Sequence, residues 1–93
     1  SLTKVQWMRF LQALRQTSFR DYLVAKMVLQ GAKRISEVLL ARVEQIDWNR
    51  SQITFKQLKS KEIEKFTMIT YPKEFMEELQ KYLGDRKEGF IFT

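Results

Sequence analysis

The chain has 93 residues, which is enough for one domain at most. A hydrophobic content of 44% with 13% aromatic residues indicates a folded core rather than disorder. The absence of cysteine and histidine excludes disulfides, Cys/His zinc sites and histidine acid–base catalysis within these residues.

The formal net charge of +6 favours a polyanionic partner. A chain without cysteine fits a reducing compartment, and we expect the cytoplasm. The longest apolar run is far shorter than a membrane span, so no membrane partner is expected.

Two helices are predicted in the first third of the chain. Thr3 is the expected N-cap of the first, with Gln6 as its capping-box partner. The second helix, about Ser18 to Gln30, is apolar around nearly its whole circumference, which indicates a central helix packed on several sides. Gly31 is its expected C-terminal stop. Five apolar residues of the first helix share one arc, which predicts a buried side: Trp7, Met8, Phe10, Leu11 and Leu14.

A third, short helix is predicted from Arg34 to about Arg42, because its apolar residues follow the helical spacing. After a turn at residues 47–50, the pattern alternates over residues 52–56, which predicts a strand. Residues 66–71 form the second strand, and the residues between the two strands form a charged hairpin tip.

The last predicted helix runs from Pro72 to Leu83, because proline suits a first helical turn and the apolar residues form one stripe. The apolar segment 89–93 is expected to pack on other residues. Because the chain stops there, we expect the fragment to end inside its domain.

Two basic clusters stand out. One is Lys33 with Arg34, at the start of the third helix, where the helix dipole disfavours cations. Arg34 therefore either pairs with Glu37 or is kept for an anion such as phosphate. From residue type and spacing alone, a surface ion pair with Glu37 is the favoured alternative. The other cluster surrounds the hairpin, where a run of charge is usually just solvated: Lys56, Lys59, Lys61 and Lys65.

Residues 31–48, GAKRISEVLLARVEQIDW, resemble the first box of the catalytic domain of tyrosine recombinases, the phage integrase family. That box has a small-residue turn, Arg, a hydrophobic residue, Ser, Glu, aliphatic residues, and a loop into Asp before a strand. Residues 53–61, ITFKQLKSK, are similar to the family's strand–Gln-x-Lys-Ser/Thr–strand hairpin, at the right distance downstream. The resemblance covers essentially the whole chain and looks closest to plasmid-borne integrases.

The resemblance implies that Arg34 is the first catalytic arginine, which grips the scissile phosphate, with Glu37 as its acidic support. It implies that Lys59 is the hairpin lysine that reaches the minor groove and the leaving 5′-hydroxyl. Three further lysines are candidate DNA contacts: Lys33, Lys56 and Lys61. The implied reaction is attack by a tyrosine on a DNA phosphate, giving a 3′-phosphotyrosyl link that is later rejoined. It needs no metal, nucleotide or other cofactor.

The sequence departs from the family pattern in three ways. Lys33 stands where the family commonly has an apolar residue, and Lys61 lies so close to Lys59 that the hairpin lysine is open between them. The family's second box, His-or-Lys-x-x-Arg, has no match in these residues. The three tyrosines do not lie in the family's nucleophile context, so packing roles are expected for them and the fragment alone should not cut DNA: Tyr22, Tyr71 and Tyr82.

The prediction is an α+β fold with about four helices around a central buried helix and a two- to three-stranded antiparallel sheet. Residues 1–93 form one partial domain, without the family's preceding DNA-embracing domain and following catalytic half. The expected function is part of a site-specific recombinase that acts on double-stranded DNA as a homotetramer. A non-catalytic DNA-binding or regulatory module on the same fold is one alternative. A protein-interaction domain with incidental basicity is another.

Overall fold

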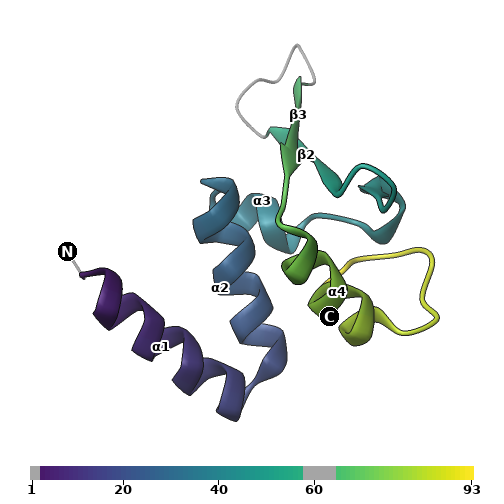
Figure 1. The fold of residues 1–93 in the computed structure, drawn as a ribbon. Helices are drawn as coiled ribbons and strands as arrows, with labels where there is room; N and C mark the ends of the chain where they lie inside the picture. The colour runs from purple at the N-terminus through teal and green to yellow at the C-terminus, as the bar shows by residue number, and fades with distance from the viewer. Residues whose placement is uncertain (1–2, 58–64) are drawn as a thin grey trace.

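Helix α2 (Phe19–Gly31) is the element on which the other helices pack. The computed structural model describes residues 3–57 and 65–93, and in it α2 contacts α1 (Lys4–Thr17), α3 (Ile35–Leu39) and α4 (Lys73–Leu83) (Figure 1). Its residues Leu23 and Met27 are fully buried, as a central helix requires. The helices and a three-stranded sheet together confirm the predicted α+β class.

The start of α1 is the one predicted from the sequence. The Thr3 hydroxyl accepts a hydrogen bond from the Gln6 N–H at 3.2 Å, and the Gln6 side chain accepts one from the Thr3 N–H at 2.8 Å. The predicted buried side of this helix is buried only in part: Leu11 and Leu14 pack against the core, but no residue of the helix is fully buried and Phe10 is 45% exposed. Its apolar side lines an open groove of about 470 Å³ shared with α2 and α3.

The end of α2 lies one residue beyond the prediction. Gly31 belongs to the helix, and Ala32 takes the left-handed conformation, with φ 51° and ψ 40°. Glycine is required at position 31 for another reason, because a Cβ there would overlap the Tyr71 hydroxyl. That hydroxyl is buried and donates a hydrogen bond to the Met27 carbonyl at 2.9 Å.

Helix α3 ends at Leu39, three residues before the predicted end at Arg42. Beyond Leu40 the chain becomes extended at Arg42, where it forms an antiparallel bridge with Phe90 of the C-terminal segment. The Ile91 N–H donates to the Ala41 carbonyl at 3.0 Å, and the Val43 N–H donates to the Gly89 carbonyl at 2.8 Å. A short 3₁₀ helix, η1 (Val43–Gln45), follows.

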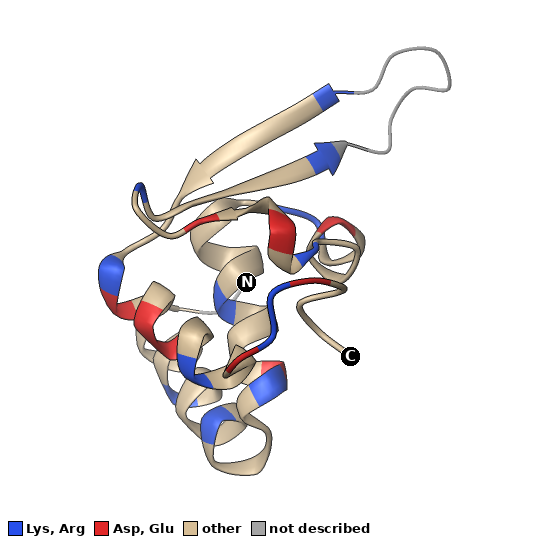
Figure 2. Cartoon of the chain, turned by 90° about the vertical axis from the view of Figure 1, so that its right-hand side faces the viewer, with Lys and Arg blue, Asp and Glu red and all other residues tan. Residues whose placement is uncertain are grey.

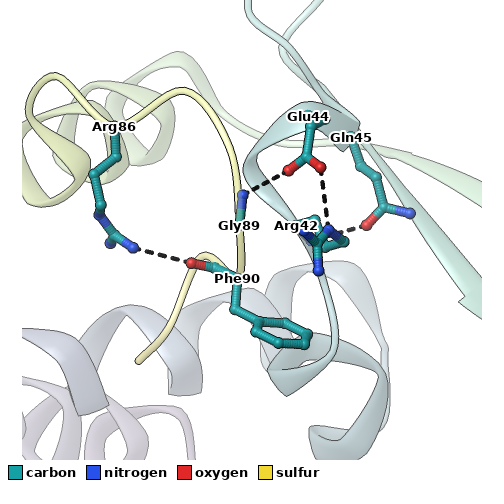
Figure 3. A network of polar contacts seen from close by, with 6 residues as sticks. All are labelled: Arg42, Glu44, Gln45, Arg86, Gly89 and Phe90. Carbon is teal, nitrogen blue, oxygen red and sulfur yellow. Dashed lines mark hydrogen bonds and ion pairs between the residues drawn. The ribbon is translucent and has the colours of Figure 1, made fainter.

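Side chains reinforce this junction between η1 and the C-terminal segment (Figure 3). The Glu44 carboxylate accepts hydrogen bonds from the Arg42 guanidinium at 3.1 Å and from the Gly89 N–H at 2.8 Å. Arg86 donates to the Phe90 carbonyl at 3.0 Å, while the Arg42 guanidinium lies 5.0 Å from the centre of the Phe90 ring. Ile91 is fully buried, so the predicted packing of segment 89–93 takes place on this chain's own core.

The sheet has the strand order β1-β2-β3 and is antiparallel throughout. Strand β1 (Ile46–Asp47), which was not predicted, pairs with the start of β2 (Gln52–Gln57), and β2 pairs with β3 (Lys65–Thr70). Ile53 and Phe55 of β2 are fully buried, as the alternating pattern predicts. The β2–β3 ribbon projects from the helices (Figure 1).

A charged cluster ties α4 to α2 and α1. The Glu78 carboxylate accepts hydrogen bonds from the Lys26 ammonium at 3.1 Å and the Tyr22 hydroxyl at 3.2 Å, and Arg15 lies 3.6 Å from its other oxygen. Burial would lower the pKa of Lys26, but hydrogen bonds to Tyr22 and Glu78 outweigh it, and the pKa is raised. The part-buried Glu78 therefore has a cation from each of the two neighbouring helices.

Candidate functional site

Arg34 lies where the chain leaves the end of α2 and enters α3. It occupies the N-cap position of α3 in an extended conformation, with φ −76° and ψ 149°. Its side chain is exposed, and within residues 3–57 and 65–93 its guanidinium has no ion pair and no hydrogen bond. A guanidinium presents five donors in a rigid plane, so an unpaired one on the surface is ready to bind an anion in a bidentate manner.

Glu37 faces the backbone of Arg34 rather than its guanidinium. One carboxylate oxygen accepts a hydrogen bond from the Arg34 N–H at 3.2 Å, and the other lies 3.7 Å from the Lys33 ammonium. The side chains of Lys33 and Glu37 are only 9% and 11% exposed. The surface ion pair between Arg34 and Glu37, which spacing alone favours, is not formed. The Glu37 carboxylate is instead paired with Lys33.

Lys33 also contacts the sheet, through Phe55 of β2. Its ammonium lies 6.0 Å from the centre of the Phe55 ring, which belongs to β2 and is fully buried. The strand that leads into the hairpin is thus held against the turn that carries Arg34. Lys56, the next residue of β2, is exposed.

Two of the hairpin lysines, Lys56 and Lys65, lie on the described strands of the ribbon. Bands of basic residues mark the far ends of the two strands, where Lys56 and Lys65 lie (Figure 2). Lys59 and Lys61 fall outside the described residues, so the structure does not place the predicted hairpin lysine. The Lys33 side chain, predicted from the sequence as a DNA contact, is 9% exposed and paired with Glu37.

The three tyrosines occupy packed positions. Tyr22 donates its hydroxyl hydrogen bond to Glu78, and Tyr82 packs 5.8 Å from the Phe92 ring. Tyr71 donates to the Met27 carbonyl, and burial raises the pKa of its hydroxyl. A tyrosine nucleophile must lose its proton, and a raised pKa makes that loss harder for Tyr71.

Two features of the site go beyond the sequence-based expectations. The Lys33–Glu37 pair has the i,i+4 spacing of helical ion pairs, so that spacing was the signal available for it. The junction of Glu44 with Gly89 joins residues 45 positions apart, and no local pattern marks it.

The described residues hold no group of three or more acidic side chains placed to bind a metal ion. Among these same residues, no helix has the length and apolar character needed to cross a membrane.

The arrangement of these elements matches the fold of a recombinase of known structure. The crystal structure of XerA recombinase superimposes with a TM-score of 0.77 at 18% identity, over 99% of this chain and 34% of that chain. At that identity the likeness concerns the fold alone. The model of the phage integrase family matches residues 1–93, and the chain belongs to this family. The resemblance to tyrosine recombinases is thereby confirmed.

Relatives with higher identity include integrases of virulence plasmids. The chain is 44% identical over 93 residues to the virulence plasmid integrase pGP8-D of Chlamydia trachomatis serovar L2, covering 100% of this chain and 28% of that protein. It is 41% identical over 93 residues to pGP8-D of Chlamydia muridarum, with the same coverage. Virulence plasmid integrase pGP7-D of Chlamydia trachomatis serovar L2 is 39% identical over 93 residues, covering 100% of this chain and 30% of that protein. The chain thus spans less than a third of the relatives it matches.

Proposed function

We propose that the full-length protein is a site-specific DNA recombinase or integrase in which Arg34 binds the scissile phosphate. The observation that carries this proposal is the exposed guanidinium of Arg34, which is unpaired within the described residues although an acidic residue lies three positions away. Membership of the phage integrase family supplies the reaction class.

The proposed chemistry is a phosphoryl transfer. The oxygen of a tyrosine outside these residues attacks the phosphorus, the bond to the 5′-oxygen breaks, and a 3′-phosphotyrosyl link forms. Negative charge grows on the non-bridging oxygens in the transition state, where the Arg34 guanidinium donates two hydrogen bonds to them. Lys59 gives a proton to the departing 5′-oxygen, and the reverse reaction rejoins the strand. The chemistry requires no cofactor.

The remaining residues have supporting roles in this proposal. Glu37 fixes the first turn of α3 through its hydrogen bond with the Arg34 N–H. Lys56 and Lys61 contact the DNA backbone as the projecting ribbon reaches the duplex. The proposed partner is double-stranded DNA, bound by a homotetramer of the full-length protein. The 93-residue fragment alone is proposed to be inactive, since its tyrosines are committed to packing.

Covalent capture tests the role of Arg34. A DNA substrate nicked beside the cleavage site loses the short 5′-hydroxyl strand and traps the protein on DNA. Arg34→Ala in the full-length protein should reduce the capture rate by roughly 100-fold or more, as expected for removal of a transition-state donor. Arg50→Ala is the matched control, because Arg50 is an exposed arginine on the turn between β1 and β2. Normal capture by Arg34→Ala would refute the proposal.

A second substrate tests the hairpin lysine. A sulfur atom in place of the bridging 5′-oxygen leaves as a thiolate and needs no proton, so it should restore cleavage to a variant that lacks the general acid. We expect rescue of Lys59→Ala and no comparable defect in Lys61→Ala. If the sulfur substrate rescues Lys61→Ala instead, Lys61 is the general acid. If it rescues neither variant, the general acid does not come from the hairpin.

A further inference from the structure

Lys33 is a nearly buried cation beside the proposed phosphate-binding arginine. Its side chain is 9% exposed, its ammonium lies 3.7 Å from a Glu37 oxygen, and the Phe55 ring centre lies 6.0 Å away. An ammonium is costly to bury without an anionic partner, and the loss of that partner is costlier than a surface pair would suggest. The Lys33–Glu37 contact is therefore a fixed element of the site.

Both oxygens of Glu37 are occupied by this arrangement. One accepts from the Arg34 N–H at 3.2 Å and the other faces Lys33. Without Lys33, the carboxylate would carry an uncompensated charge three residues after Arg34, which is a spacing at which helical side chains pair. The guanidinium could then pair with Glu37 in competition with phosphate.

We propose that Lys33 is a positioning residue that neutralises Glu37 and so keeps the Arg34 guanidinium available for the DNA phosphate. The proposal rests on the proposed function of Arg34. The Lys33 side chain is nearly buried, and its ammonium lies close both to the Phe55 ring and to the Glu37 carboxylate. Lys33 thus combines a packing role with an electrostatic one, which an apolar residue at this position could not supply.

A double-mutant cycle in the full-length protein separates these two roles. Lys33→Met keeps an unbranched stem of similar length and removes the charge. We expect it to slow covalent capture on the nicked substrate by roughly ten-fold, because Glu37 then competes for Arg34. Glu37→Gln added to it removes the competing charge but keeps an oxygen that can accept from the Arg34 N–H. The double variant should therefore recover to within about three-fold of the unmodified protein.

Recovery of capture must be separated from recovery of stability, because Glu37→Gln also removes the cost of leaving a nearly buried charge unpaired. If Lys33 only stabilised the fold, Lys33→Met would capture DNA at the normal rate when assayed well below the Tm of every variant. Lys33→Arg, which keeps the cation, should capture DNA at nearly the normal rate. Thermal unfolding of each variant identifies one that does not fold. If Lys33→Met is unfolded, the comparison of Lys33→Gln with Lys33→Gln/Glu37→Gln tests the same competition.

The outcomes distinguish this inference from the proposed function. Normal capture by Arg34→Ala would overturn the proposed function and the inference together. An inactive Arg34→Ala combined with normal capture by Lys33→Met would overturn the inference alone. A double variant no faster than Lys33→Met would likewise overturn it, even where Lys33→Met itself is slow.

Discussion

Gly31 and Tyr71 meet where α2 ends, two residues before Lys33, and the substitution Gly31→Ala tests that contact. The new Cβ would overlap the Tyr71 hydroxyl and lie 3.0 Å from its ring carbon Cζ and 3.4 Å from Ile69 Cγ2. Tyr71 is 2% exposed, so it cannot turn aside without disturbing the core. We expect Gly31→Ala to destabilise the chain even though alanine ordinarily favours a helix over glycine.

The magnitude follows from two costs and one gain. Overpacking of a core costs about 1–3 kcal/mol, and loss of the hydrogen bond from Tyr71 to Met27 costs about 0.5–1.5 kcal/mol. The gain in helix propensity offsets at most about 1 kcal/mol. A net destabilisation of about 2 kcal/mol should lower the Tm by roughly 8–16 °C for a domain of this size.

Tyr71→Phe is the informative second change, because it removes the atom that the Cβ overlaps. Alone, it should cost only its hydrogen bond to Met27, about 1 kcal/mol. The double variant should be about as stable as Tyr71→Phe alone, so the two substitutions should be strongly non-additive. Urea and thermal unfolding of the four proteins measure the coupling. Additive costs would refute the argument that the hydroxyl is what excludes a side chain at position 31.

Gly84→Ala supplies the control for this cycle. Gly84 has φ +61°, and a Cβ added to it would have no atom within 4 Å, so its substitution strains the backbone without crowding. We expect a cost of about 1–2 kcal/mol that Tyr71→Phe does not relieve.

Two further predictions concern the C-terminal segment. The pKa of Glu44 is held below its usual value by hydrogen bonds to its carboxylate. These come first from the Glu44 backbone, then from Arg42 and from the Gly89 backbone. A depressed carboxyl pKa contributes stability above the unfolded value, about 4.3, that is lost as the pH falls through the folded value. The Tm difference between Glu44→Gln and the unmodified chain should therefore be largest near pH 7 and disappear by about pH 2; a constant difference would contradict this. Ile91→Ala should cost about 2–4 kcal/mol, against about 1 kcal/mol or less for the exposed Phe90→Ala, in urea unfolding. Equal costs would contradict the packing described here.

Features set by neighbouring residues were predictable from the sequence, while features set by distant ones were not. The capping box of Thr3 and Gln6 closes within one helical turn, and the inward positions of Ile53 and Phe55 follow from strand alternation. The end of α3 depends on hydrogen bonds with residues 89 and 91, which no local pattern contains. Similarly, the conformational freedom of glycine predicts a helix end at Gly31, but the contact that requires glycine there is with Tyr71.

The candidate site follows the same division. The position of Arg34 at the start of a helix was predicted, together with the alternatives of pairing with Glu37 or remaining available for an anion. The choice between them depends on Lys33, whose burial against Phe55 is a tertiary contact with β2. The apolar arc of α1 identified which side faces α2 but not how much of it stays open, because that depends on what else packs there.

The pairing of residues 89–91 with residues 41–43 has a consequence for synthesis on the ribosome. The first 88 residues emerge before the chain segment that completes the core around Ala41 and Val43. Until residues 89–91 have left the ribosome, the Val43 N–H and the Ala41 carbonyl lack their partners, and the bridge between Arg42 and Phe90 cannot form. Contacts between residues so far apart in sequence form late. A pause in translation shortly before residue 89 should therefore leave a protease-sensitive nascent chain, and a pause placed well beyond residue 93 should not.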